Sequence, residues 1–446
     1  MTDRLQTLTE AMLSAARRAG AEAADALAVD GTSVSIDIRA GRLEQAERAE
    51  GIELGLRVLI GGRQACVSVS DTSARTLQDM AERAVAMARE APEDRWCGLM
   101  DAGALGAPVD PATLMLQDAA AAPEPAALQA LALEAEAAAR GVAGVAQVDS
   151  AQASHGRTAL ALAASNGFHG GYARTTVGLS VSAIAGEGTA MEGDYDYAAR
   201  RRMADLPSPG EIGRRAGARA VARLNPRKAP SGAFPVLFDR RVAPSLIGHL
   251  LAAANGAAVA RGASWLSGRM GEAVLPDWAD VLEDPLLPGG PASRPFDAEG
   301  VAARPQPVVT GGRLARWLLD GATARQLGLE TTGNARRGVS SPPSPGASNI
   351  RISIGDRSPQ ALMAEMGRGL MVTSLMGASV NPTTGAYSRG AAGFWIENGA
   401  IAHPVSEATI AGSLPDFLRR MIAADDPDPY AATSVPALLV EGLVVA

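Results

Sequence analysis

The segment GIELGLRVLIGGRQACVSVSD, residues 51–71, constrains the fold more than any other stretch of this 446-residue chain. Apolar and polar residues alternate over 52–60 and again over 65–69, the period of two that a half-buried β-strand shows. The pair Gly61-Gly62 between the two runs is typical of the tight turn of a β-hairpin. The segment therefore predicts two antiparallel strands with an apolar face that other elements must cover.

Helical periodicity appears on both sides of this hairpin. Apolar residues three and four positions apart predict an amphipathic helix at the N-terminus and another over about 73–90, with strands between them over roughly 24–71. Further along, the patterns predict a helix near 126–140, strands over 144–197 and a charged helix near 209–224. No repeat with a fixed period is visible. Antiparallel strands with flanking helices indicate an α+β fold.

The main domain boundary is predicted at NPRKAPSGAFPVLFD, residues 225–239, because its three prolines disfavour regular elements. An N-terminal α+β domain of antiparallel strands and flanking helices is then expected over 1–225, with a further boundary within the Pro- and Ala-rich connection 91–125 as an alternative. Residues 226–446 are expected to form a strand-rich C-terminal domain that opens with a helix, PSLIGHLLAAANGAAVARGASWL (244–266).

Composition excludes several classes of partner. The net charge of −7 argues against an extended nucleic-acid-binding face, and the basic clusters ARRRMAD (199–205) and GRRAGARA (213–220) are interpreted as solvated faces of helices. No apolar run approaches the roughly 18 residues that span a bilayer, and the N-terminal helix does not resemble a signal peptide. The two cysteines, Cys66 and Cys97, suggest no disulfide framework. We therefore expect a cytoplasmic protein without nucleic-acid or membrane partners.

The sequence contains few residues that could act as catalytic groups or metal ligands. The four histidines are His155, His169, His249 and His403; none is followed by glutamate, and no two lie four positions apart as a zinc-protease helix requires. The G-x-S-x-G motif of serine hydrolases is absent. No catalytic residue and no metal ligand is therefore assigned, although a zinc site assembled from distant residues stays open as an alternative.

Glycines and short polar residues are dense between residues 374 and 414. Glycines at such spacing let the backbone approach a ligand or another backbone closely. The same pattern is also typical of tight hairpin turns, such as the one predicted at ENG (397–399), and both interpretations stay open for 381–393. In that segment Gly385, Gly390 and Gly393 are interspersed with polar residues that include Asn381, Thr384, Ser388 and Arg389.

Two segments of the C-terminal half, TTGNARRG (331–338) and NPTTGAYSRGAAGFWIENGAIAHPVSEATIAG (381–412), resemble the C-terminal signature of the TldD/PmbA family. ASNGFHGGY (164–172) and the N-terminal helix with its hairpin are similar to the same family, so the resemblance covers nearly the whole chain. In this family, TldD-type chains hold a zinc ion with an H-E-x-x-x-H helix and a later cysteine. PmbA-type chains, also called TldE, lack those ligands and pair with TldD in a heterodimeric protease that acts on unfolded or extended peptides.

The resemblance assigns this chain to the PmbA type, which lacks the zinc ligands. Alignment of ARGASWL (260–266) with the residues after the TldD zinc helix puts Ile247, Gly248 and Ala252 where histidine, glutamate and histidine would stand, and the C-terminal half contains no cysteine. The resemblance therefore implies no catalytic residue, no metal ligand and no cofactor in this chain, with zinc in a TldD-type partner. His249 is then a core or interface histidine. The resemblance also makes these seven residues between 381 and 393 the candidate substrate-contacting residues, which would form the wall of a peptide-binding cavity.

A second hypothesis is a non-catalytic peptide-binding or chaperone-like homodimer without a protease partner. The sequence alone does not separate it from the first. A hydrolase with a site of its own is disfavoured, because paired catalytic residue types are absent.

Overall fold

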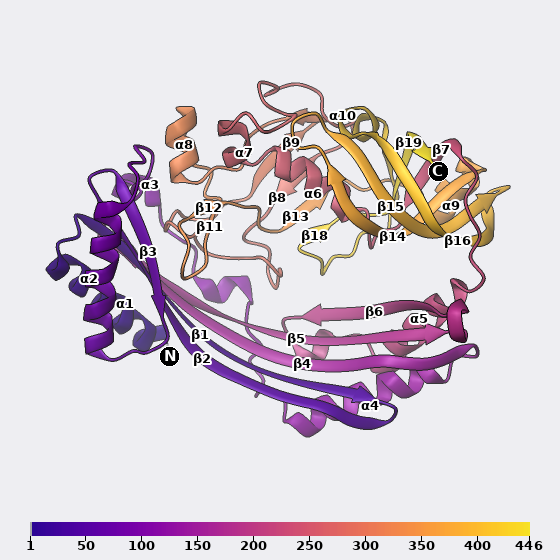
Figure 1. Ribbon diagram of the computed structural model, residues 1–446, viewed down its shortest axis with the longest axis horizontal. Helices are drawn as coiled ribbons and strands as arrows, with labels where there is room; N and C mark the ends of the chain where they lie inside the picture. The colour runs from indigo at the N-terminus through magenta and orange to yellow at the C-terminus, as the bar shows by residue number, and fades with distance from the viewer. Residues whose placement is uncertain (1) are drawn as a thin grey trace.

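The computed structural model describes residues 2–446. It places the two halves of the chain in two layers, a long curved sheet with its helices below and a second, strand-rich domain above (Figure 1). The second domain lies over the face of the sheet opposite to the one that the long helices cover.

The lower layer uses one arrangement of elements twice. A helix, three strands and a second helix form the first unit: α1 (Thr2–Ala19), β1 (Ala23–Arg39), β2 (Arg42–Ile60), β3 (Arg63–Val69) and α2 (Ala74–Glu90). The second unit has the same order: α4 (Pro125–Arg140), β4 (Val145–Ala164), β5 (His169–Ala185), β6 (Glu192–Arg200) and α5 (Pro209–Ala222). The six strands join in one antiparallel sheet of order β3-β2-β1-β4-β5-β6. Strands β1 and β4 therefore pair at its centre, and β3 and β6 are its edges.

The hairpin that the sequence predicts most clearly is β2–β3. Leu56 pairs with Val67 near its middle, and Gly61 and Gly62 turn the chain with φ of +53° and +70°. Glycine adopts these left-handed conformations without steric cost, so the turn needs this pair. The helices and strands predicted for the first half all form, and the predicted α+β class is confirmed.

The four long helices cover one face of this sheet, α1 and α2 at one end and α4 and α5 at the other (Figure 1). Even-numbered side chains of β1 point to these helices: Ala26 is buried with α1 and α2, and Ile36 with α4. Successive side chains of a strand alternate between faces, so the odd-numbered Asp25 and Leu27 face the C-terminal domain and make their contacts there.

The connection between the two units runs between the layers and is held by the upper one. It contains α3 (Ala102–Leu105) and a 3-10 turn, η1 (Pro111–Leu114). Arg325, in α8 (Gly321–Leu327), donates hydrogen bonds to the carbonyl oxygens of Trp96 and Gly98 at 2.8 and 3.3 Å. The Thr175 N–H of β5 donates to the carbonyl oxygen of Leu116 at 3.0 Å, so the Pro- and Ala-rich connection is fixed to both layers.

The C-terminal domain contains two main sheets around one core. The strands of the larger sheet are β7 (Gly232–Phe238), β14 (Gly369–Val380), β15 (Ala386–Glu397), β16 (Ala400–Ser413), β17 (Ile422–Ala423) and β19 (Leu438–Val445), in the order β16-β15-β14-β7-β19-β17. The strands of the smaller sheet are β8 (Val281–Glu283), β9 (Gln306–Thr310), β10 (Arg313–Leu314), β13 (Ile350–Ile352) and β18 (Thr433–Ser434), in the order β10-β9-β8-β13-β18. Short elements complete the domain: α6 (Pro244–Ala253), α7 (Gly256–Ala260), α9 (Pro359–Met366), α10 (Leu414–Phe417), β11 (Ala335–Arg336) and β12 (Ser344–Pro345).

This domain opens with strand β7, so the prediction that it opens with a helix is wrong, and a regular element forms where the prolines of 225–239 were expected to disfavour one. Strand β7 contains Pro235 and lies inside the larger sheet, between β14 and β19. The ladder to β19 is interrupted between Val440 and Leu443, beside Pro235. Proline has no N–H to donate and is tolerated where a strand ladder is interrupted.

The apolar stretch 244–266 forms two short helices rather than one long helix. Helix α6 ends at Ala253, and Asn255 begins α7 by accepting a hydrogen bond from the Ala257 N–H at 3.0 Å through its side chain. This is the geometry of an N-cap. No helix within residues 2–446, these two included, is long and apolar enough to cross a membrane.

Candidate functional site

The glycine-rich segment begins with the turn between β14 and β15. The Asn381 side chain accepts hydrogen bonds from the N–H groups of Thr383 and Thr384 at 2.9 and 3.0 Å. The Thr384 hydroxyl accepts one from the Ala386 N–H at 3.2 Å. Short polar side chains that bind nearby backbone in this way are typical of turns, and these two are exposed at the tip of the hairpin.

Gly385 lets this turn pack against the segment that follows α7. Its φ is +76°, and a Cβ there would lie 2.5 Å from Pro415 Cδ and 3.4 Å from the Trp265 ring. The Trp265 N–H also donates to the carbonyl oxygen of Pro382 at 2.8 Å. The close approach that this glycine permits is therefore to the chain itself. The turn predicted at 397–399 is also confirmed, with positive φ at Asn398 and Gly399 between β15 and β16.

Gly390 and Gly393 on β15 differ in the space around them. A Cβ at Gly393 would lie 1.9 Å from the backbone oxygen of Met371, whereas a Cβ at Gly390 would first meet the Met376 side chain at 3.3 Å. We expect Gly393→Ala to lower the free energy of unfolding by about 2 kcal/mol, because backbone must move to admit the methyl group. The matched variant Gly390→Ala is expected to change it by less than about 1 kcal/mol. Equilibrium denaturation of both variants measures this, and equal losses would contradict it.

Alternate residues of β15 face opposite sides. Ser388 is exposed, whereas the buried Tyr387 and the half-buried Arg389 face α6, where the ring centres of Tyr387 and His249 are 5.9 Å apart. Burial raises the pKa of Tyr387 to about 12. Burial and the Arg389 guanidinium lower the pKa of His249, so its imidazole is neutral at neutral pH. Within residues 2–446, His249 Nε2 and Arg389 Nε have no hydrogen-bond partner.

Arg389 lines a cavity of about 420 Å³ between the two layers. Its other charged residues are Asp194, Arg223 and Arg241, and Asp194 pairs with the two arginines at 3.8 and 2.8 Å. The remaining six candidates of the glycine-rich segment do not line this cavity. The structure therefore separates Arg389, which faces the space between the layers, from the turn residues at the hairpin tip.

The three positions of α6 that align with a zinc motif carry no donor atoms in their side chains. Ile247 is fully buried, whereas Gly248 and Ala252 are exposed, and a Cβ at Gly248 would meet no atom of the described residues within 4 Å. Across residues 2–446, no three His, Cys, Asp or Glu side chains are grouped so that they could hold a metal ion. The exposed face of α6 is therefore small and apolar at these positions.

The basic cluster 199–205 is not the solvated helix face that the sequence suggested. It is the end of β6 followed by a 3-10 turn, η3 (Met203–Asp205), and its arginines line a cavity of about 820 Å³. The other walls come mainly from 287–291 and 429–433. These segments lie far apart in the sequence, so no local pattern predicted the cavity. In the sequence, only the run of arginines at 200–202 pointed to a possible binding site.

The chain matches three family models in succession, described as PmbA/TldA metallopeptidase domain 1, central domain and C-terminal domain. They match residues 24–88, 118–224 and 231–446. Metalloprotease PmbA of Escherichia coli O157:H7 is 36% identical over 391 residues, which cover 88% of this chain and 84% of the relative. The metalloprotease PmbA homologue of Haemophilus influenzae is 36% identical over 414 residues, which cover 92% of this chain and 89% of the relative.

Solved structures share the whole fold. A Bacteroides thetaiotaomicron protein described as a putative modulator of DNA gyrase has a TM-score of 0.91 and 26% identity, with 100% of this chain and 99% of that chain covered. TldE from Thermococcus kodakarensis has a TM-score of 0.86 and 21% identity, with 98% of this chain and 100% of that chain covered. By its sequence matches and its fold, the chain belongs to the TldD/PmbA family of metallopeptidases and to the PmbA (TldE) type within it.

Proposed function

We propose that this chain is the metal-free subunit of a TldD/TldE-type peptidase that degrades or processes unfolded or extended peptides. A TldD-type partner holds the zinc, and this chain closes the substrate cavity. The proposal rests on the side chains at three positions of α6. Ile247, Gly248 and Ala252 carry no atom that could ligate zinc or transfer a proton. Relatives named metalloprotease PmbA support peptidase chemistry for the assembly.

The glycine-rich segment 381–393 is the part of this chain that we assign to the peptide and the partner. Asn381, Thr384 and Ser388 are exposed and offer short side chains that donate and accept hydrogen bonds. Arg389 faces the cavity between the layers and offers a guanidinium to a carboxylate of the peptide or of the partner. A subunit contact that encloses such a cavity is expected to bury upward of about 2,000 Å².

Zinc in the partner would supply a Lewis acid and an activated water. The residues of this chain would bind extended backbone, orient it and exclude folded proteins by the size of the enclosed space. Neither task needs a titratable group on α6. The exposed Gly248 and Ala252 are consistent with these separate roles of the two subunits. They leave room beside α6 where the glutamate and histidine side chains of a zinc motif would otherwise project.

The test is reconstitution with the TldD-type chain of the same genome. We expect an unstructured fluorogenic peptide to be cleaved by the mixture and by neither chain alone. Elemental analysis after dialysis is expected to find zinc in the partner and no stoichiometric zinc in this chain. Cleavage by this chain alone at the rate of the mixture, or about one tightly held zinc in it, would contradict the proposal. A stable homodimer that binds peptide and never associates with the TldD-type chain would favour the chaperone-like alternative.

A further inference from the structure

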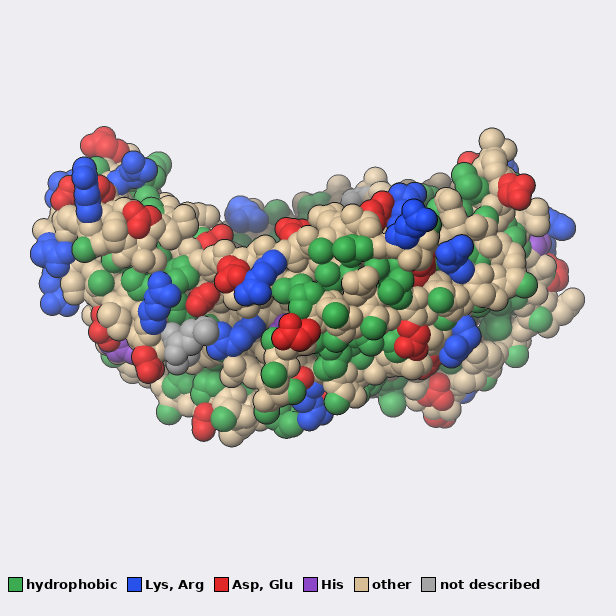
Figure 2. Space-filling view, turned by 90° about the horizontal axis from the view of Figure 1, so that it is seen from below, with side chains coloured by type: hydrophobic (Ala, Val, Ile, Leu, Met, Phe, Trp, Pro, Cys, Tyr) green, Lys and Arg blue, Asp and Glu red, His purple; other side chains and the backbone are tan. Residues whose placement is uncertain are grey.

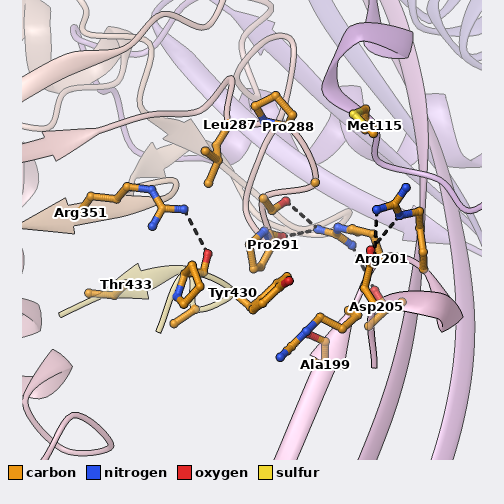
Figure 3. A pocket seen from close by; sticks show the side chains of 18 of the residues that line it. Met115, Ala199, Arg201, Asp205, Leu287, Pro288, Pro291, Arg351, Tyr430 and Thr433 are labelled. Atoms are coloured by element: carbon orange, nitrogen blue, oxygen red, sulfur yellow. Dashed lines mark hydrogen bonds and ion pairs between the residues drawn. The ribbon is translucent and has the colours of Figure 1, made fainter. Parts of the chain in front are cut away.

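The 820 Å³ cavity at the end of β6 is rich in arginine (Figure 3). Among the described residues that line it, Asp205 is the only one with a carboxylate. The chain as a whole has a net charge of −7, and acidic and basic side chains are interspersed over the outer face seen in Figure 2. The charge of the cavity is therefore opposite in sign to that of the protein. The arginines that line it are Arg200, Arg201, Arg202, Arg241 and Arg351.

Two of these arginines are neutralised by their neighbours. Arg202 pairs with Asp205 at 2.7 Å, and Arg241 pairs with Asp194 at 2.8 Å. Both pairs place a carboxylate directly on the guanidinium, so these two residues add little net charge to the cavity. Three arginines form no ion pair with a carboxylate in the part of the chain that the structure describes: Arg200, Arg201 and Arg351.

Arg201 is buried and held only by uncharged groups. It donates to the carbonyl oxygens of Gly290 and Pro291 at 3.2 and 2.5 Å, and to that of Thr175 at 2.9 Å. Its Nε has no partner among the described residues. Burial lowers the pKa of Arg201 to about 10, so the side chain is still a cation at neutral pH. Carbonyl oxygens orient this cation but leave its charge uncompensated.

Arg351 and Arg200 are oriented in a similar way. Arg351 donates to the carbonyl oxygen of Pro429 at 3.1 Å. The Arg200 guanidinium lies 3.6 Å from the centre of the Tyr430 ring, a cation–π contact. Arg200 Nε is buried and has no partner within residues 2–446. The cavity thus holds three fixed cations, each with hydrogen-bonding capacity left for an anion.

The spacing of these cations suits several carboxylates on one extended chain better than a single phosphate. Arg351 and Arg201 stand on opposite sides of the cavity, with Pro291 and Tyr430 between them (Figure 3). The guanidinium groups of Arg351 and Arg201 therefore do not converge on one point. A volume of about 820 Å³ lies in the range of sites for ligands much larger than one phosphate group.

The neighbouring sheet edge offers a place for the rest of such a chain. Strand β6 is an edge strand, so one side of its backbone has no partner strand among residues 2–446. Tyr195 and Tyr197 on this strand stack with ring centres 6.1 Å apart and are 51% and 62% exposed, and Tyr197 also lines the cavity. Extended peptides add to such edges through backbone hydrogen bonds and use exposed aromatic rings as contact area.

We infer that this cavity binds the carboxylate side chains of an acidic, extended peptide segment through charge-assisted hydrogen bonds from Arg200, Arg201 and Arg351. The inference rests on the proposed function for the peptide nature of the ligand. It adds a substrate class, namely peptides with clustered aspartate or glutamate. A carboxylate that enters the cavity supplies the counter-ion that three buried or half-buried guanidinium groups lack.

The test uses the full chain without a partner and a labelled, unstructured peptide of alternating glutamate and glycine. Fluorescence anisotropy is expected to show binding at least tenfold tighter than for the same peptide with glutamine in place of glutamate. The double variant Arg200→Gln/Arg351→Gln is expected to lose at least tenfold in affinity for the acidic peptide. A control with the same loss of charge, Arg75→Gln/Arg357→Gln, changes arginines outside the cavity and is expected to stay within about twofold.

Equal affinity for the two peptides, or equal losses in the two double variants, would overturn the inference. So would tight binding of inorganic phosphate that the cavity variant abolishes while both peptides bind alike, because that result would identify a small-anion site. Melting curves confirm that each variant is folded. Binding is measured without the TldD-type chain, so cleavage by the reconstituted pair with no acidic preference would leave the proposed function standing and remove only this inference.

Discussion

Replacing Asp25 with alanine is expected to lower the free energy of unfolding by about 3–5 kcal/mol, because it leaves two buried guanidinium groups without their counter-ion. Arg57 donates to Asp25 from the neighbouring strand at 2.7 Å, and Arg337 donates to it from the C-terminal domain. All three side chains are almost completely buried. Burial alone would raise the pKa of Asp25, and the two guanidinium groups lower it below its ordinary value instead.

The matched control for this variant is Asp149→Ala. Asp149 pairs with Arg39 at 3.7 Å, and both side chains are about half exposed. Exposed pairs contribute little, so we expect a loss below about 1 kcal/mol. Urea denaturation of both variants measures the difference. If Asp25→Ala loses no more than the control, the buried cluster does not hold the two layers together.

Raising the pH from about 4.5 to about 8 is expected to destabilise the protein through Glu299. Burial, with the neighbouring Asp297, raises the pKa of Glu299 from 4.5 to about 8. Between these two pH values Glu299 keeps its proton in the folded state and loses it in the unfolded chain. Its contribution to the free energy of unfolding is therefore fully present below the pKa of Glu299 in the unfolded chain, and it is lost as the pH rises through about 8. For this one carboxyl the loss is up to about 4 kcal/mol.

Glu299→Gln is expected to remove most of this pH dependence, because the amide keeps an oxygen to accept the Gly321 N–H, at 2.7 Å in the native protein, and cannot ionise. Denaturation near pH 5 and near pH 8.5 measures the slope for both proteins. The exposed carboxylate Glu365, paired with Arg357, supplies the control Glu365→Gln, which should keep the native slope. An unchanged slope in Glu299→Gln would show that another group carries the pH dependence.

Local patterns in the first half were sufficient to predict its elements. The β2–β3 hairpin could be predicted because its alternation and its Gly61-Gly62 turn are contiguous in sequence. The repeated order of elements could not be predicted, because the two units share topology without a visible sequence period. Strand β7 was missed for a different reason: Pro235 argues against a strand locally, and only the interrupted ladder to β19 makes it acceptable.

In the candidate site, too, contacts between distant parts of the chain could not be predicted. Sequence patterns marked the glycine-rich segment but not the partners of its glycines. Gly385 packs on Pro415 and Gly393 on the Met371 backbone, contacts that depend on how distant parts of the chain fold together. The role of Arg389 and the exposed turn residues in peptide binding stays a prediction. The predicted family and α+β class are confirmed. Both could be predicted because motifs and hydrophobic periodicities extend along most of the chain.

The doubled helix–three strands–helix unit of the lower layer has a consequence for how such a chain could arise. A single unit would expose the edge of β1, and the antiparallel pairing of β1 with β4 is the contact that two identical copies would make across a twofold axis. The lower layer therefore has the arrangement of a homodimer whose two subunits are joined by a peptide link. Because the two units are parts of one chain, their sequences do not have to match. The first now anchors the upper domain through Asp25 and Arg57, and the second ends in the arginine run that lines the large cavity.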